Sequence, residues 1–576
     1  MQGVFIFSDF KPFTKEIIVQ LGIPDNQVIS TQTFEKENNY HDWLTDVFKN
    51  NEIKQILIPL NLNTNDPIND GLRIALHIRL NYELAVIKRI IPIIFLSDLT
   101  LDVVIRNNDF DPDINPQNIL LTKGVFLSSF DTDQIKILIN KVKPCAENEY
   151  NLRILNKLKI SQKASVGKHS ISNAWGCFKL AQVTGLRDEI YKDGYVTDHL
   201  KSLYAKYLIC YNDTYTNDRL IDLSPIKCNG KKILLIDDQA EEGWSILMKN
   251  IFKSAGNDFR AIDGSKYKNS ETKLFHDFES FYSECQKQIG KDWDLILMDL
   301  RLNPEKEDID NDIISPTHFS GYKLIDEFLN QNKGYQIIVS TASNKIWNIN
   351  AALKRGATSY YIKESPEFNY SIRETKRNYE NFKYDVQKCF EKYYLRTIYT
   401  DIQKIKIQLA KKAYTITFLN ELNSQLDLAF EMIYHANSKV QFAYAFVTLY
   451  LFIEAINNYF VSKVADDKWE VEDSGHLLDW KWDNGAYSNT SAEVTGYKPP
   501  EWQKFAGVYF QKWLKTDNNF IQTIYFLITK RNGFIHNDSG ILDKKDSAGN
   551  YLNHDIYNPN GFLKLFECIK VICNYL

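Results

Sequence analysis

The stretch Lys232–Asp238 reads KILLIDD, a short apolar run that ends in two aspartates. A second run of the same character, Asp294–Asp299 (DLILMD), also ends in an aspartate. Continuous apolar runs of this length are typical of strands that are buried on both faces of a parallel sheet. Because ligands bind beyond the carboxyl ends of such strands, the acids that follow them predict an active-site edge.

Two further apolar runs continue the pattern. Gln336–Val339 is followed closely by Thr341, Ser359–Ile362 is followed directly by Lys363, and Trp244–Phe252 repeats apolar positions at helical spacing. Four strands alternating with helices predict a parallel α/β sheet. Carboxylates that converge at one edge repel each other unless a hard cation such as Mg²⁺ joins them, and a hydroxyl and an ammonium nearby suit a transferred phosphoryl group.

In motif order, residues 231–366 resemble the receiver domain of bacterial response regulators. The resemblance implies that Asp299 accepts a phosphoryl group from a cognate histidine kinase or phosphotransfer protein. It further implies a Mg²⁺ site and three switch residues. The metal ligands would be Asp238, Asp299, the acidic partner Asp237 and the backbone carbonyl of Arg301, and the switch residues Thr341, Tyr360 and Lys363. One departure is Glu364, which follows the lysine where the family usually has proline.

An internal echo predicts a second, degenerate receiver-like domain over residues 1–142. Ile56–Asn63 (ILIPLNLN) aligns without gaps with Ile296–Asn303 (ILMDLRLN), so Pro59 falls where Asp299 stands. Asp70-Gly71 also corresponds to Ser320-Gly321, and Ile90–Ser97 to Gln336–Ser343. The first strand, Val4–Phe7, corresponds to Lys232–Ile236 but is followed by Ser8-Asp9 in place of an acid pair. Proline cannot accept phosphate, so we expect this copy to bind or dimerise. The alternative is an unrelated α/β domain of similar hydrophobic pattern.

Between the two predicted sheets, residues 146–225 lack strand alternation and are expected to be helical. This segment contains KHSISNAWGCFKL, in which His169 and Asn173 lie four residues apart and share one helix face. The pattern is similar to the phosphoacceptor helix of some sensor kinases and phosphotransfer proteins, which implies a relay through His169 or dimerisation. The simpler interpretation is a capping or packing histidine.

After the predicted receiver, residues 367–412 are expected to form a helical connector, and residues 413–576 an all-α bundle. The expected helices are Thr415–Tyr434, Val440–Val464, Trp502–Lys515, Asn519–Gly533 and Gly561–Tyr575. The polar insert at about Ala465–Pro500 is expected to be a surface loop. Its tryptophans, Trp469, Trp480 and Trp482, are expected to pin that loop to the domain, with stacking on bases as the alternative.

In the sequence KRNGFIHND, Asn532 directly follows Arg531, and four residues separate Arg531 from His536. This pattern matches the R-x4-H signature of HEPN domains, including the polar residue after the arginine. The resemblance implies a dimeric endoribonuclease with Arg531, Asn532 and His536 in its site, and Glu454 as a supporting polar residue. A histidine can move the proton of a ribose 2′-hydroxyl and an arginine can stabilise the phosphorane charge, so this cleavage needs no metal. Chance occurrence of so short a pattern is the alternative.

Composition narrows the setting. The chain of 576 residues carries a net charge of −4, so no global basic field holds nucleic acid. Eight cysteines without a C-x-x-C pair indicate neither a disulfide framework nor a zinc ribbon, and the first residues lack the basic region of a signal peptide. The apolar run Phe442–Ile456 contains Glu454 and fits a buried helix better than a membrane span. We therefore expect a cytoplasmic protein with no membrane partner.

Together these patterns favour a multidomain chain with two receiver-like doubly wound sheets, a helical middle segment and a C-terminal helical bundle. The favoured function is a phosphorylation-controlled effector that cleaves RNA as a homodimer, a pairing that suits phage defence. The rival function is a non-enzymatic signalling adaptor, in which the HEPN-like bundle dimerises or binds a partner. Replacement of His536 separates the two, because an adaptor keeps its output without it.

Overall fold

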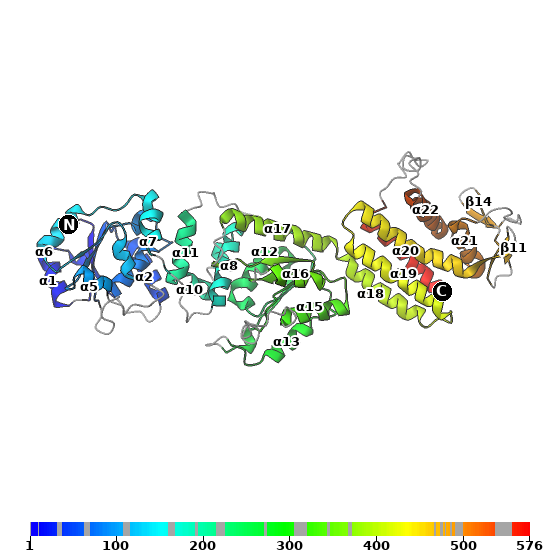
Figure 1. Cartoon of the computed structure of the whole chain (residues 1–576), viewed down its shortest axis with the longest axis horizontal. Helices are drawn as coiled ribbons and strands as arrows, with labels where there is room; N and C mark the ends of the chain where they lie inside the picture. Colours follow the sequence, from blue (N-terminus) through cyan, green and yellow to red (C-terminus); the bar gives the residue numbers. More distant parts are fainter. Residues whose placement is uncertain are drawn as a thin grey trace. The chain divides into compact units, whose positions relative to one another are not determined.

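The computed structural model describes residues 2–9, 11–31, 37–62, 70–106, 116–158, 160, 168–190, 194–214, 225–269, 274–303, 319–342, 346–366, 371–465, 468–472, 476–478, 480–483, 486–489, 499–535 and 556–576. The chain divides into two compact units. Figure 1 labels their helices and strands. One comprises Met1–Glu327 with Gln336–Phe390, and the other comprises Phe328–Tyr335 with Glu391–Leu576. Both receiver-like sheets belong to the first unit, and the C-terminal bundle belongs to the second.

The N-terminal sheet has five parallel strands in the order β2-β1-β3-β4-β5. The strands are β1 (Val4–Ser8), β2 (Val28–Ser30), β3 (Gln55–Pro59), β4 (Ile93–Leu96) and β5 (Val125–Ser128). The helices around it are α1 (Pro12–Leu21), α2 (Glu37–Asn50), α3 (Asp70–Arg79), α4 (Val86–Arg89), α5 (Leu101–Arg106) and α6 (Thr132–Lys141). Phe5 and Phe7 pack into one hydrophobic cluster and Val4 and Ile6 into another. Both faces are therefore buried, which explains the continuous apolar runs.

The second sheet repeats this topology in the order β10-β9-β8-β6-β7, again with all strands parallel. Its strands are β6 (Ile233–Ile236), β7 (Phe259–Ile262), β8 (Leu295–Met298), β9 (Ile337–Thr341) and β10 (Ser359–Ile362). Its helices are α12 (Ser245–Ile251), α13 (Phe278–Gln286), α15 (Ser320–Gln331), α16 (Ile346–Lys354) and α17 (Ile372–Glu391). The sequence pattern missed β7, because only Ile262 of this edge strand is buried.

Strand register gives the two copies a residue-by-residue correspondence. Ile56 pairs with Phe5 and Ile93, as Ile296 pairs with Leu234 and Ile337. The alignment of Pro59 with Asp299 therefore holds in three dimensions. The predicted match of Ile90–Ser97 to Gln336–Ser343 is wrong by two residues, because the register places Ser97 at the position of Thr341. The error arose because both stretches are apolar throughout and offer no polar landmark.

Each receiver-like domain has an equivalent glycine packed against the residue that ends or follows its central strand, Gly71 at β3 and Gly321 at β8. A Cβ on Gly71 would lie 2.4 Å from the carbonyl oxygen of Pro59, and one on Gly321 would lie 2.3 Å from that of Asp299. Each glycine also donates its backbone N–H to the carbonyl of the next residue, Leu60 or Leu300. The first turn of α3 or α15 thus lies directly against the residue that ends the central strand, which only glycine permits.

The middle segment is helical where it is described, with α7 (Asn156–Leu158), α8 (Lys168–Thr184), α9 (Arg187–Ile190), α10 (Gly194–Leu200) and α11 (Leu203–Thr214). Helix α11 packs on the N-terminal domain, where buried Lys206 Nζ lies 2.9 Å from His77 Nδ1. Helix α8 packs on the second sheet's domain beside Trp244. The segment therefore has a structural role of its own within the first unit.

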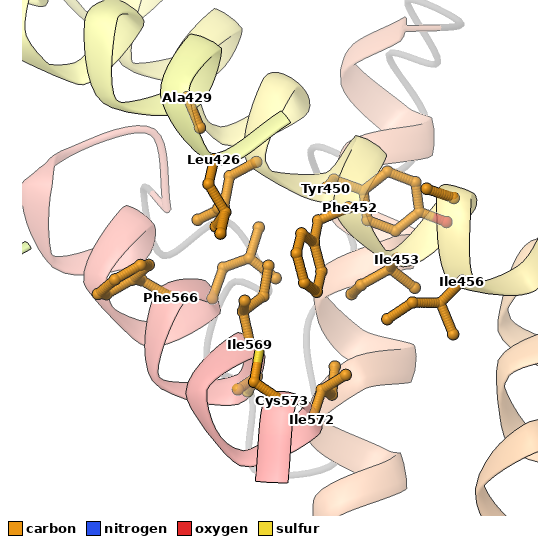
Figure 2. Packing of buried hydrophobic residues seen from close by; sticks show 14 of the residues in the cluster. Leu426, Ala429, Tyr450, Phe452, Ile453, Ile456, Phe566, Ile569, Ile572 and Cys573 are labelled. Carbon is orange, nitrogen blue, oxygen red and sulfur yellow. The ribbon is translucent and has the colours of Figure 1, made fainter. Parts of the chain in front are cut away.

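The second unit is built on α18 (Tyr394–Leu409), α19 (Ile416–His435), α20 (Lys439–Phe460), α21 (Glu501–Gly507), α22 (Asn518–Ile535) and α24 (Pro559–Tyr575). Leu426 of α19, Ile453 of α20 and Ile569 of α24 meet in its core (Figure 2). Four predicted bundle helices correspond to α19, α20, α22 and α24, whereas the predicted helix Trp502–Lys515 is α21 as far as Gly507 and a π-helix over Val508–Lys512. The predicted single connector 367–412 is instead divided, since α17 lies in the first unit and α18 in the second.

Two details of this unit differ from or refine the sequence analysis. The predicted helix Val440–Val464 ends early, at Phe460, and Val461–Ala465 forms strand β11, of which only Val461 is buried. The insert predicted as a loop contains strands β12 (Lys468–Val471), β13 (His476–Leu477), β14 (Trp480–Asp483) and β15 (Ala486–Asn489), and the strands pair antiparallel. Among the described helices, α20 is long and apolar enough to cross a membrane, but 61% of its most apolar window is buried in the protein. It packs as the core helix of the bundle.

Candidate functional site

Three carboxylates converge at the carboxyl edge of the second sheet. Asp237 and Asp238 follow β6, and Asp299 follows the neighbouring β8, with its backbone N–H donated to the carbonyl of Ile236. Carboxylate oxygens of all three lie within 4.8 Å of one another, the only such cluster of potential metal ligands found among the described residues. The two sequence runs that ended in acids are therefore adjacent strands, and their acids form one pocket.

Lys363, the residue after β10, bridges two of these acids. Its Nζ lies 2.6 Å from Asp237 Oδ2 and 2.9 Å from Asp299 Oδ2, and its side chain is 1% exposed. The ammonium also lies 5.0 Å from the ring centroid of Trp244. A buried ammonium held between two carboxylates positions a positive charge where a phosphoryl group on Asp299 would need it.

The acids and the lysine perturb each other's titration. Burial raises the pKa of Asp299, an effect that Lys363 opposes and Asp237 reinforces. Burial likewise raises the pKa of Asp238, with Asp237 and Asp299 adding to the effect. Burial lowers the pKa of Lys363, but Asp237 and Asp299 outweigh it and the net direction is upward. The crowding of the acids thus favours the protonated forms of Asp238, Asp299 and Lys363.

The two other predicted switch residues lie on β9 and β10. Thr341 is buried at the end of β9, and its carbonyl accepts the backbone N–H of Lys363. Tyr360 lies on β10 beside Val339 and is 39% exposed. Thr341 therefore ends the strand that lies between β8 and β10, which Asp299 and Lys363 follow, while the Tyr360 ring lies at the surface.

The predicted backbone ligand belongs to the segment after Asp299. Arg301 donates its backbone N–H to Asp299 Oδ1 at 3.3 Å, and its guanidinium lies 5.1 Å from the ring centroid of Phe319. Three carboxylates in a buried pocket are a donor set that fits a hard divalent cation. Those residues, with the Arg301 carbonyl, are the ones that would hold it.

The N-terminal copy has lost this pocket. By register, Ser8 and Asp9 take the places of Asp237 and Asp238, Pro59 that of Asp299, and Phe130 that of Lys363. The one acid that remains, Asp9, is paired with Lys11 at 3.0 Å. The site therefore lacks both the acceptor carboxylate and the bridging ammonium.

This loss agrees with the comparison with known families. Residues 10–128 match the family described as the inactive receiver domain. A search of the curated proteins finds no match to the chain. The match covers the N-terminal copy and makes the chain similar there to a receiver without phosphoacceptor chemistry, which is consistent with response-regulator-type signalling.

A contact that the sequence analysis did not anticipate links α8 to the loop after the acid pair. Asn173 donates its side-chain amide to Gln239, and its Oδ1 accepts the Trp244 indole N–H at 3.3 Å. Gln239 in turn donates its backbone N–H to Asp237 Oδ1 at 3.0 Å. Of the proposed relay residue His169, the structure gives only the backbone, on α8. The helix face that carries Asn173 therefore lies near the acidic pocket, and the side chain of His169 is outside the described residues.

Of the RNxxxH motif, the structure describes only the helix that carries its first part. Arg531 and Asn532 lie in the last turns of α22, which ends at Ile535. Their side chains and the whole of His536 lie outside the described residues. Glu454 lies on α20 of the same bundle, and its side chain is half-buried. The motif is thus placed at a helix end of the bundle by its backbone alone.

Glu364 stands where the receiver pattern has proline, and it is buried against α17. Thr375 donates its hydroxyl to Glu364 Oε2 at 2.8 Å. Burial raises the pKa of Glu364 to about 7, while Lys179 of α8 and the side chains of Thr375 and Asn378 lower it and Glu374 raises it. The net result is a carboxyl group that is easier to bury as the neutral acid.

We predict that this domain is less stable at pH 8 than at pH 5 because of Glu364. The unfolded carboxyl ionises near its ordinary pKa, whereas the folded one stays protonated until about pH 7. Stability is therefore lost as the pH rises through that window, by about 3 kcal/mol in total. Hydrogen exchange of β10 and α17 amides across this range should show a smaller loss in Glu364→Gln than in the wild type, the remainder coming from the raised pKa values of Asp238 and Asp299. Exposed Glu380→Gln is the control, and an unchanged pH dependence in Glu364→Gln would contradict the prediction.

Proposed function

We propose that this chain is a response-regulator-type effector, in which Asp299 accepts a phosphoryl group and thereby controls the C-terminal helical unit. The observation that carries the proposal is the buried pocket of Asp237, Asp238, Asp299 and Lys363, beside Thr341. A histidine kinase or phosphotransfer protein would supply the phosphoryl group. We place the protein in the cytoplasm.

In the proposed transfer, a carboxylate oxygen of Asp299 attacks phosphorus, a new O–P bond forms and the bond to the donor breaks. Lys363 is already hydrogen-bonded to Asp299, so its ammonium can neutralise the incoming negative charge. The Thr341 hydroxyl can then donate to a phosphoryl oxygen, and that shift lets Tyr360 turn inward. When Mg²⁺ is bound by Asp238, Asp299 and the Arg301 carbonyl, it supplies further neutralising charge.

For the output we propose endoribonuclease activity at the RNxxxH motif. His536 would take the proton from a ribose 2′-hydroxyl, whose oxygen attacks phosphorus as the bond to the 5′-oxygen breaks. The leaving oxygen gains a proton, and the products are a 2′,3′-cyclic phosphate and a 5′-hydroxyl. Arg531 would stabilise the phosphorane charge and Asn532 would orient the phosphate. Two copies of the chain would bring two motifs together.

The test is cleavage of a mixed RNA by the purified full-length protein. It is measured in EDTA and then with Mg²⁺ and acetyl phosphate as phosphoryl donor. We expect cleavage products with cyclic phosphate ends, and a change in rate when the donor is present. Phosphorylation of the protein without cleavage under any condition would leave a signalling adaptor, whose bundle binds a partner. Phage defence is a setting in which a controlled ribonuclease of this kind would act.

A further inference from the structure

A second buried lysine, Lys268, contacts the acidic cluster at Asp238. Lys268 lies between β7 and α13, and its Nζ lies 2.6 Å from the carbonyl oxygen of Asp238 and 3.2 Å from Asp238 Oδ2. Its side chain is 4% exposed, and Glu241 Oε1 lies 3.8 Å from the ammonium. The acid that would be a principal metal ligand is therefore already paired with a positive charge.

The surrounding chain is built to hold Lys268 in this place. Its ammonium lies 4.9 Å from the ring centroid of Phe275, the residue with which its backbone forms an antiparallel bridge. A Cβ on Gly264 would lie 2.5 Å from the Asp238 carbonyl oxygen and 2.8 Å from Lys268 Cε. The glycine thus leaves the space through which the lysine reaches the acid. A surface lysine that happened to fold inward would need none of these features.

Two ammonium groups already offset most of the negative charge of the three carboxylates. Lys363 pairs with Asp237 and Asp299, and Lys268 pairs with Asp238, so each carboxylate of the cluster has an ammonium within 3.2 Å. A divalent cation bound to Asp238 would lie close to the Lys268 ammonium. Like charges at such a distance in a buried pocket repel strongly. The Lys268 ammonium therefore disfavours a divalent cation on the same carboxylate.

We propose that Lys268 is an internal cation that competes with divalent metal for Asp238 and so sets the metal affinity of the phosphorylation pocket. Metal binds Asp238 more tightly once the ammonium has left it. At rest each acid of the cluster has a lysine partner, and metal binding at Asp238 exchanges one cation for another. The inference rests on the metal site of the proposed function, and it is independent of RNA cleavage.

The experiment is calorimetric titration of the full chain with Mn²⁺ and with Mg²⁺. We expect Lys268→Met to bind both ions about 10- to 100-fold more tightly than the wild type. Lys266→Met, an exposed lysine two residues away, should bind as the wild type does. The double variant Lys268→Met with Asp238→Asn should lose the gain. Equal affinities in the wild type and Lys268→Met would overturn the inference and leave the metal site itself standing.

A second measurement uses the unaltered protein, in case Lys268→Met fails to fold. Amine acetylation followed by peptide mass spectrometry should label Lys268 several-fold faster when Mn²⁺ saturates the site, because the displaced ammonium becomes accessible. Labelling of the exposed Lys287, which contacts none of the three acids, gives the internal reference. Metal binding with no change at Lys268 would overturn the inference, whereas absence of metal binding in every variant would overturn both the inference and the proposed Mg²⁺ site.

Discussion

Replacement of Asp299 by asparagine should abolish phosphorylation of the chain by acetyl phosphate. An amide oxygen is a poor nucleophile, and Asp299 is the most accessible acid of the cluster, with 14% of its side chain exposed against 1% for Asp237 and 4% for Asp238. Asp237 is held by Lys363 at 2.6 Å, and Asp238 by Lys268 at 3.2 Å. We expect incorporation to fall to background, which is a loss of about 100-fold or more for removal of a reacting group.

Intact-protein mass spectrometry measures the gain of one phosphoryl group, and its loss in mild base identifies an acyl phosphate. Asp292→Asn is the matched control, since its carboxylate is exposed near the opposite end of β8. Asp299→Asn should also remain folded, because the substitution removes one of three mutually repelling charges and keeps the size of the side chain. Undiminished labelling of a folded Asp299→Asn protein would exclude Asp299 as the acceptor. Label that is lost in acid but stable in base would instead point to histidine, and to His169 first.

The two receiver-like copies suggest a division of roles. The N-terminal copy keeps the sheet, the Gly71 contact and a packed core, yet Pro59 and Phe130 replace the two residues on which phosphoryl chemistry depends. Its α3 and α4 region instead holds α11 through His77 and Arg89. We infer that this copy serves as a binding platform, while the second copy carries the response to phosphorylation.

Much of this arrangement was predictable, because strands of a parallel sheet are buried on both faces and appear in the sequence as continuous apolar runs. Asp237, Asp299 and Lys363 each follow such a run directly, so their meeting at one edge followed from topology. Lys268 follows no buried strand, since it lies in the segment after the poorly buried β7. Its contact with Asp238 depends on Gly264 and Phe275, and no spacing rule connects these residues.

In the C-terminal unit the helices could be predicted from the sequence, but the strands could not. Helical periodicity predicted α19, α20, α22 and α24, because each buries an apolar stripe in a shared core. The strands of the insert were not predicted, because they are held by pairing with one another and show no recurrent apolar pattern. Chemistry at the RNxxxH motif rests on residue identity alone, which makes mutation of His536 the decisive experiment for this unit.

Replacement of His536 by alanine should reduce RNA cleavage about 100- to 10,000-fold, the usual effect of removing a general acid–base group. Cleavage in EDTA should be lost equally, because the mechanism uses no metal. Electrophoresis of a 5′-labelled RNA measures the rate, and chemical detection of cyclic phosphate ends identifies the reaction. His435→Ala is the matched control, since it removes an exposed histidine at the end of α19 in the same unit. Arg531→Ala should slow the reaction in the same way. Equal cleavage by the wild type and His536→Ala would assign the activity to a contaminant or another site, and would leave the adaptor function in its place.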